Sequence, residues 1–92
     1  MLLEFKPSFQ KGLDKLKKTN PQIDKRIHEL INDIIQHPFE GIGKPEPLKY
    51  EFSGCWSRRI DKKNRIIYKV LSNDDNTELV MLIFLSCEGH YN

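Results

Sequence analysis

The sequence lacks several features that define common classes of protein. Its longest apolar run, residues 79–85, is far shorter than the roughly 20 residues that a membrane-spanning helix needs. The opening Met1-Leu2-Leu3 is too brief for a signal peptide, so we expect a cytoplasmic protein without membrane contact. The two cysteines, Cys55 and Cys87, lack the spacing of a zinc site and predict reduced thiols. We therefore expect neither a metal nor a cofactor.

Basic residues are absent from the last part of the chain and concentrated in its middle. Residues 71–92 contain four acidic side chains and no Lys or Arg, whereas residues 41–70 contain eight basic and three acidic side chains. The net charge of the whole chain is only +2. Clustered Lys and Arg side chains attract polyanions such as nucleic acids. For Lys62 and Lys63, a solvated turn is the better explanation of the charge.

The order of the predicted elements favours a single α+β domain over residues 1–92. A short strand is expected at residues 2–5, and Pro7 suits the first turn of a helix. A second helix is predicted from about Pro21 to Gln36, because isoleucine and leucine recur along one side of it. A loop rich in glycine and proline then covers about ten residues.

Four further segments are predicted to be strands, at Leu48–Phe52, Trp56–Ile60, Arg65–Leu71 and Glu78 to about Ser86. Short polar segments between them are typical of turns. The last strand is apolar on both faces, so we expect it to be central and covered on both sides. The prediction is therefore two N-terminal helices packed on a mainly antiparallel sheet.

A carboxylate, several basic side chains and a histidine are the groups needed to cleave RNA through its own 2′-hydroxyl. This reaction requires a base for the hydroxyl proton, an acid for the leaving 5′-oxygen and positive charge near the phosphate. Glu46 lies between two prolines in a stiff loop and is followed by Lys49, which makes it a candidate base. An exposed loop carboxylate without a chemical role would explain the same position.

Arg65 at the start of a strand is a candidate phosphate ligand, because a guanidinium group can donate two parallel hydrogen bonds. Arg59 is expected to share a face of its strand with Ser57. If Ile60 pairs directly with Arg65, however, Arg59 and Arg65 project from opposite faces. Both reach one site only if the turn at residues 61–64 takes in a further residue or a bulge.

His90 is the natural candidate for the acid, since the ordinary pKa of histidine, about 6.5, allows proton release near neutrality. Tyr91 beside it could stack on a base or donate a hydrogen bond to a phosphate. A frayed end without a role is the alternative for this pair. Cys87 has no basic partner in the sequence and is interpreted as a small buried residue.

Four blocks of the sequence, in order, resemble the YoeB/Txe branch of the RelE/ParE toxin superfamily. They are Gly41-x-Gly43-Lys44-Pro45-Glu46-Pro47-Leu48-Lys49, Gly54-x-Trp56-Ser57-Arg58-Arg59-Ile60, Arg65-Ile66-Ile67-Tyr68 and Cys87-x-x-His90-Tyr91. The resemblance extends over nearly the whole chain.

The resemblance implies a small α+β toxin of the microbial-ribonuclease-like type, with helices packed on an antiparallel sheet. Such toxins belong to type II toxin-antitoxin systems, enter the ribosomal A site and cut messenger RNA without a metal, and a cognate antitoxin neutralises them. The implied roles are general base for Glu46, transition-state stabilisation for Arg65, general acid for His90, substrate orientation for Tyr91 and RNA binding for Lys44, Lys49 and Arg59. A homodimer is possible, and operator DNA would be bound only through the antitoxin complex.

The sequence departs from this pattern before His90, where Glu88 and Gly89 replace a basic residue and an aromatic one. We expect Glu88 to weaken phosphate attraction and Gly89 to loosen the segment. Two other functions stay open. One is a ParE-like toxin, which would share the fold and bind DNA gyrase. The other, which this departure favours, is a catalytically weak homologue that binds the antitoxin and regulates the operon. The toxin-binding segment of an antitoxin should be acidic or amphipathic, and disordered until bound.

Overall fold

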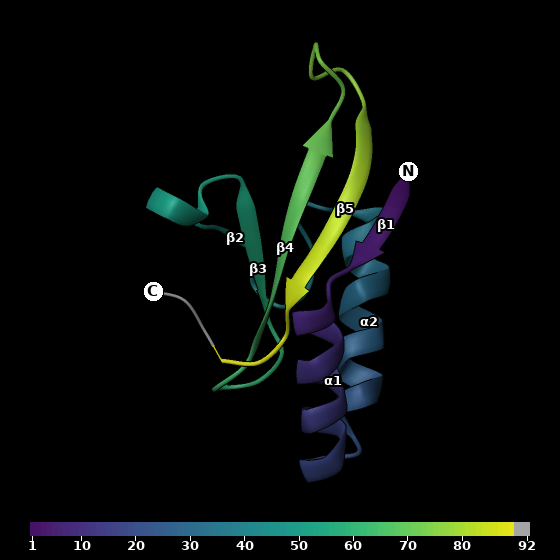
Figure 1. Ribbon diagram of the computed structural model, residues 1–92, viewed down its shortest axis with the longest axis vertical. Coiled ribbons are helices and arrows are strands. Elements are labelled where there is room, and N and C mark those ends of the chain that lie inside the picture. The colour runs from purple at the N-terminus through teal and green to yellow at the C-terminus, as the bar shows by residue number, and fades with distance from the viewer. Residues whose placement is uncertain (90–92) are drawn as a thin grey trace.

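The structure, a computed structural model, describes residues 1–89 and confirms the predicted α+β class (Figure 1). Its elements are β1 (Leu2–Phe5), α1 (Pro7–Thr19), α2 (Ile23–Gln36), β2 (Glu46–Pro47), the 3-10 turn η1 (Tyr50–Phe52), β3 (Cys55–Arg59), β4 (Arg65–Ser72) and β5 (Leu79–Ser86). They form one five-stranded sheet in the order β1-β5-β4-β3-β2. The pairing of β1 with β5 is parallel and the other pairings are antiparallel.

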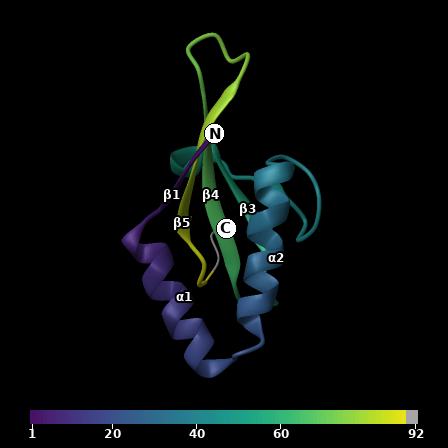
Figure 2. The same ribbon diagram turned by 90° about the vertical axis from the view of Figure 1, so that its right-hand side faces the viewer.

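Both helices pack against the same face of the sheet (Figure 2). The core between the two layers is apolar and consists mainly of Phe9 and Leu13 from α1, Ile27, Leu30 and Ile34 from α2, and Ile66, Tyr68, Leu82 and Phe84 from the sheet. Burial of these side chains supplies most of the drive for folding. Among residues 1–89, no α-helix covers the opposite face of the sheet, which we call the open face. Within residues 1–89, neither helix is long and apolar enough to cross a membrane.

The predicted strand at Leu48–Phe52 is wrong. The strand in this region is only Glu46–Pro47, and a 3-10 turn follows at residues 50–52. The backbone N–H of Phe52 donates to the Lys49 carbonyl (3.1 Å), and Tyr50 has a φ of +58°. The alternation of apolar residues resembled a strand, but the chain must reverse here to enter β3. The reversal closes hydrogen bonds within the turn instead of along a sheet edge.

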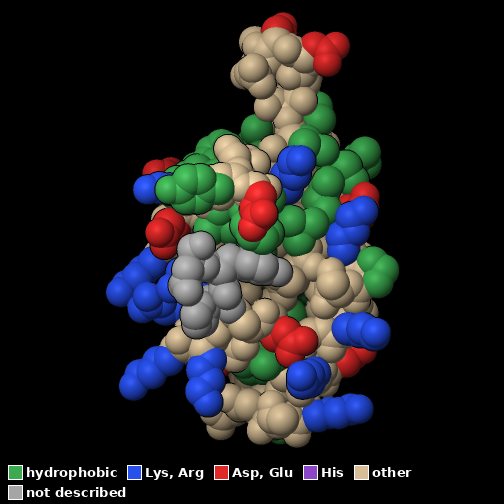
Figure 3. Space-filling model, turned by 60° about the vertical axis from the view of Figure 1, so that its left-hand side comes forward, with side chains coloured by type: hydrophobic (Ala, Val, Ile, Leu, Met, Phe, Trp, Pro, Cys, Tyr) green, Lys and Arg blue, Asp and Glu red, His purple; other side chains and the backbone are tan. Residues whose placement is uncertain are grey.

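The predicted position of the last strand is only half correct. β5 lies inside the sheet, between β1 and β4, as expected. Its even-numbered residues Leu82 and Phe84 are buried under the helices, whereas Met81 and Ile83 on the other side are only half-buried. The expectation that both sides are covered is therefore wrong. Apolar side chains gather in the upper part of the open face in the space-filling view (Figure 3).

Candidate active site

The register of β2, β3 and β4 brings the predicted site residues to the open face. Glu46 pairs with Ser57, and Arg59 pairs with Arg65. Directly paired residues point to the same face of a sheet, and residues alternate along a strand. Glu46, Arg59 and Arg65 therefore all project from the open face.

The turn between β3 and β4 explains why the two arginines share a face. It extends over residues 60–64, because the backbone N–H of Ile60 donates to the Asn64 carbonyl at 2.9 Å. The turn thus takes in one residue more than the polar segment at residues 61–64. Asp61 stabilises it by accepting hydrogen bonds from the backbone N–H groups of Lys63 (2.8 Å) and Asn64 (2.7 Å). Lys62 and Lys63 are exposed in this turn, as expected.

Glu46 and Arg65 form the centre of the candidate site. Glu46 Oε2 lies 3.6 Å from Arg65 Nη1, and the side chains are 64% and 24% exposed. A pocket of about 280 Å³ lies beside them and is lined by Glu46, Pro47, Leu48, Lys49, Tyr50, Phe52 and Arg65. An exposed ion pair at this distance is weak, so a substrate phosphate can replace the carboxylate at the arginine. Glu46 is therefore exposed, but it has a cationic partner next to it at the edge of a pocket.

The other predicted site residues take different positions. Lys49 lines the pocket with Glu46, while Lys44 is exposed on the loop before β2 and has a φ of +52°. Arg59 is half-buried opposite Arg65 and does not line the pocket. His90 and Tyr91 lie outside the described residues.

Gly89, the last described residue, is fastened next to Arg65. Its N–H donates to the Asn64 side-chain oxygen at 2.9 Å, and its carbonyl accepts from the Arg65 N–H at 3.0 Å. Its φ of +73° favours glycine. The backbone of Gly89 is thus hydrogen-bonded on both sides, whereas the terminal segment that it was expected to loosen lies outside the described residues. The chain is fixed beside Arg65 one residue before His90.

Glu88 directs its charge toward the first helix. Its carboxylate lies 3.5 Å from Lys15 Nζ of α1, with both side chains well exposed. Exposed pairs of this kind contribute little to stability. The pair nevertheless places a cation next to the acidic residue that departs from the family pattern.

Arg58 is buried on the face of the sheet that the helices cover. Its side chain is 0% exposed. Arg58 is one of the eight basic residues at positions 41–70 that were expected to attract a polyanion, and for this residue the expectation is wrong. The guanidinium donates hydrogen bonds to the Asp33 carboxylate (2.6 Å), the Tyr68 hydroxyl (3.1 Å) and the backbone carbonyls of His37, Glu40 (2.8 Å) and Ile42 (2.9 Å). The alternation with Trp56 and Ile60 was the sequence signal for this burial.

Asp33 completes this network from α2. It also accepts the Ile42 N–H at 3.0 Å, and the hydrogen bond from Arg58 lowers the pKa of its carboxyl. The Tyr68 hydroxyl in turn donates to the Pro38 carbonyl at 2.6 Å. A buried charge needs such partners, because desolvation would otherwise be unfavourable by several kcal/mol. The loop at residues 37–42 is thereby fixed to the sheet.

Two glycines allow this loop to pass close to its neighbours. A Cβ at Gly41 (φ +120°) would lie 2.0 Å from Asp33 Oδ2, and one at Gly43 (φ +79°) would lie 2.7 Å from a Leu30 methyl carbon. The Gly43 carbonyl accepts the Arg59 N–H at 2.6 Å. The network and this bond hold the backbone that leads three residues later to Glu46.

The cysteines take no part in the site. Cys55 and Cys87 are free and buried, as the sequence predicted. Burial raises the pKa of the Cys87 thiol to about 12, so it stays protonated and is a poor nucleophile. Among residues 1–89, no group of three or more His, Cys, Asp or Glu side chains is arranged to hold a metal ion.

The surface around the site is basic. Lys and Arg side chains gather in the lower half and along one edge of the open face, and the apolar part lies above them (Figure 3). This distribution agrees with the concentration of basic residues at positions 41–70. Such a surface attracts phosphates without regard to nucleotide sequence.

The fold and the site together define the class of protein. Two helices on one face of a five-stranded, mostly antiparallel sheet are shared with the YoeB/ParE toxin from Agrobacterium tumefaciens, at a TM-score of 0.85 and 34% identity over 99% of this chain and 100% of that one. The fold is therefore that of the RelE/ParE toxin superfamily.

The chain belongs to the YoeB-like toxins of bacterial type II toxin-antitoxin systems, whose family model matches residues 5–91. It is 48% identical to toxin YoeB of Escherichia coli strain K12 over 73 residues, and these residues cover 79% of each chain. It also resembles YoeB of Staphylococcus aureus, solved as a dimer (TM-score 0.79, 34% identity, 99% and 98% covered) and in a YoeB–YefM complex (TM-score 0.76, 35% identity, 99% of each chain).

Proposed function

We propose that this toxin is a ribosome-dependent endoribonuclease that cleaves messenger RNA in the A site and thereby inhibits translation. The observation that carries the proposal is the position of Glu46 and Arg65, which lie 3.6 Å apart and line one pocket together with Lys49. A base and a phosphate ligand must be adjacent for attack by a 2′-hydroxyl. Family membership supports the same reading.

The proposed reaction transfers two protons and needs no metal. Glu46 removes the proton from the 2′-hydroxyl, the 2′-oxygen attacks the adjacent phosphorus, and a 2′,3′-cyclic phosphate forms. The bond to the 5′-oxygen breaks, and His90 supplies the proton to that leaving group. Arg65 stabilises the extra negative charge on the phosphate oxygens in the transition state.

The remaining site residues bind and orient the RNA in this proposal. Lys49 lines the pocket, whereas the exposed Lys44 and Arg59, which pairs with Arg65, attract the RNA backbone from outside it. Tyr91 orients the substrate beside His90. The hydrogen bonds of Gly89 to Arg65 and Asn64 support the assignment of His90, because His90 follows Gly89 directly in the sequence.

The proposed partners follow from the relatives and from the surface charge. The S. aureus relative forms a dimer and a complex with YefM, and we propose a homodimer and a cognate antitoxin for this chain as well. The antitoxin would cover the basic open face and mediate any contact with operator DNA. The toxin would act on ribosomes and messenger RNA in the cytoplasm.

Cleavage on translating ribosomes tests the proposal directly. Purified toxin is added to ribosomes paused on a defined message, and the 3′ ends are mapped. We expect cuts in the A-site codon that disappear with Glu46→Ala or His90→Ala. Glu51→Ala is the matched control, because Glu51 is exposed nearby but does not line the pocket.

Other outcomes would assign the other functions. Full cleavage by Glu46→Ala would contradict the mechanism. Gyrase-dependent DNA damage without messenger cleavage would favour a ParE-like toxin. Antitoxin binding without either activity would indicate a regulatory homologue.

A further inference from the structure

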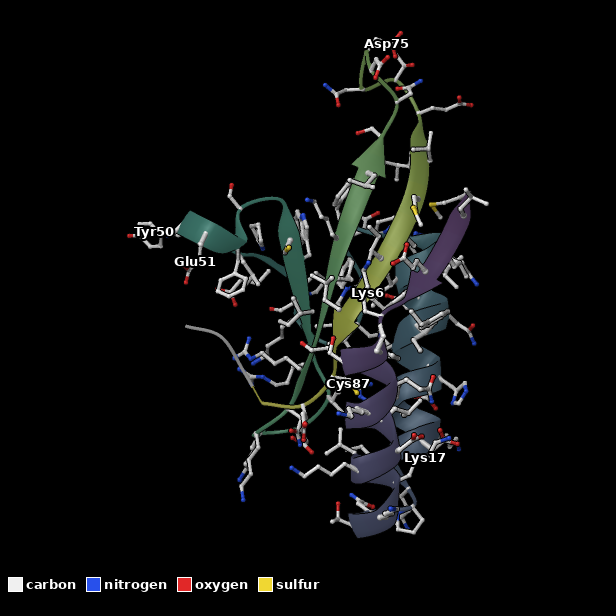
Figure 4. All side chains as sticks on the ribbon, viewed as in Figure 1. Lys6, Lys17, Tyr50, Glu51, Asp75 and Cys87 are labelled. Carbon is white, nitrogen blue, oxygen red and sulfur yellow. The ribbon has the colours of Figure 1, made fainter. Side chains whose placement is uncertain are left out.

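Tyr50 is the most exposed large hydrophobic residue beside the candidate site. It lies in the turn between β2 and β3, 90% exposed, and its ring points away from the body of the molecule (Figure 4). Neither the family pattern quoted above nor the proposed mechanism uses it. It nevertheless lines the same pocket as Glu46, Lys49 and Arg65.

The backbone at Tyr50 is in an unfavourable conformation for a tyrosine. Its φ of +58° lies in the left-handed region, which a residue with a large side chain seldom adopts. Such strain persists only where surrounding contacts impose it, and it is concentrated at functional sites. Here two hydrogen bonds close the turn, from the N–H of Phe52 to the Lys49 carbonyl (3.1 Å) and from the N–H of Ser53 to the Tyr50 carbonyl (3.0 Å). The turn therefore holds an aromatic ring out in solvent.

We propose that Tyr50 positions the substrate by stacking on a base of the messenger RNA next to the scissile phosphate. The inference rests on the proposed ribonuclease function and names a contact for the base, in addition to those for the phosphate. Glu46 and Arg65 take the ribose hydroxyl and the phosphate, so the base of a neighbouring nucleotide falls beside the same pocket. Single-stranded RNA is recognised in this way, by aromatic rings stacked on unpaired bases beside basic side chains.

The geometry favours RNA over a protein partner for this ring. Lys49 precedes Tyr50 directly and also lines the pocket, so a cation and an aromatic face are presented together. A phosphate in the pocket and a base stacked on the exposed ring outside it would thus belong to neighbouring parts of one RNA strand. An antitoxin contact alone is the competing explanation and is an outcome of the test.

The test combines variants of the toxin with abasic nucleotides in the message. Cleavage on programmed ribosomes is measured under single-turnover conditions for wild type, Tyr50→Ala, Tyr50→Phe and the control Glu51→Ala. A stacked base contributes ~1–3 kcal/mol, so Tyr50→Ala should lower kcat/KM about 5- to 150-fold. Tyr50→Phe should retain most activity, because it keeps the ring. Thermal melting should show all variants folded, since the side chain is exposed.

The abasic messages identify the stacking partner. Removal of the base at one position near the cut should lower the cleavage rate of the wild type by a similar factor. The same abasic message should not lower the cleavage rate of Tyr50→Ala any further. The inference would be overturned if Tyr50→Ala lowered the cleavage rate by the same factor on every abasic message as on the intact one. It would also be overturned if Tyr50→Ala cleaved RNA normally and only bound the antitoxin less tightly. Absence of cleavage by the wild type would overturn the proposed function itself, and the inference with it.

Discussion

Arg58 and Arg59 are neighbours in the chain, yet they belong to two different parts of the molecule. Arg58 points to the helices, is 0% exposed and donates five hydrogen bonds. Arg59 is half-buried on the open face, opposite Arg65. One residue of strand alternation thus separates a buried arginine from one on the face that carries the candidate site.

The two faces of the sheet differ in the same way as these two arginines. The covered face combines apolar burial with a closed polar network, whereas the open face carries the pocket with Glu46, Lys49 and Arg65. Stability and chemistry are therefore assigned to opposite sides. Variants on one face should alter one property and leave the other largely unchanged.

The largest effect is expected from Arg58→Ala. The change leaves Asp33, Tyr68 and three backbone carbonyls without their donor, and breaking a buried charge pair destabilises proteins by about 3–5 kcal/mol. Urea unfolding followed by Trp56 fluorescence measures the loss. Arg58→Lys should recover only part of it, because an ammonium group cannot reproduce the planar set of donors. Near-native stability of Arg58→Ala would mean that the network is dispensable.

The next effect is a loss of activity on the open face. Arg65→Ala should lower kcat about 100-fold or more, comparable to removing a donor from an oxyanion site. The free energy of unfolding should fall by only about 1 kcal/mol, because Glu46, the partner of Arg65 in the ion pair, is 64% exposed at 3.6 Å. Single-turnover cleavage and urea unfolding of the same preparation test both parts. A loss of stability as large as that of Arg58→Ala would contradict the division between the faces.

Asp33→Asn should have a smaller effect that depends on pH. The hydrogen bond from Arg58 lowers the pKa of Asp33 in the folded state. The ionised carboxylate therefore stabilises the fold at pH values above the pKa of an unfolded Asp, about 3.9. This contribution is lost as the pH falls through the lower pKa of the folded state. At pH 7 we expect a loss of about 2 kcal/mol. The difference from wild type should shrink below pH 4 in thermal melts. A difference independent of pH would contradict this role of the charge.

The smallest effect on stability is expected from Arg59→Ala. Its free energy of unfolding should lie within about 0.5 kcal/mol of the wild-type value, as for most substitutions outside the core. Cleavage should nevertheless weaken, and its dependence on salt concentration should decrease, because one phosphate contact is removed. Measuring the cleavage rate over a range of salt concentrations tests this. An unchanged salt dependence would remove Arg59 from the site.

Much of the fold could be predicted from periodicity. The isoleucine stripe of the second helix and the alternation in β3 and β4 depend on local pattern, and these elements are confirmed. The strand at Leu48–Phe52 was wrong, because the same alternation occurs in a turn whose shape depends on where β3 begins. Coverage of β5 was wrong because it depends on where the helices lie, and two helices cover only one face.

The site was harder to predict than the fold. Glu46 and Arg65 were identified from residue type and family resemblance, but their shared face required the register set by the turn at residues 60–64. The burial of Arg58 was visible in the alternation with Trp56 and Ile60, yet a partner 25 residues away on α2 could not be deduced. Tyr50 gave no signal, because a positive φ is not encoded in residue type for tyrosine.

The parallel pairing of β1 with β5 has a consequence for the synthesis of the toxin. β1 is made first and β5 is the last of the five strands to be made, and Lys6 N–H also donates to the Phe84 carbonyl at 2.9 Å. Contacts so distant in sequence form late in folding. The nascent chain therefore cannot complete its sheet while β5 is still being translated. The sheet of this toxin thus stays incomplete until the ribosome that makes it has translated nearly all of residues 1–86.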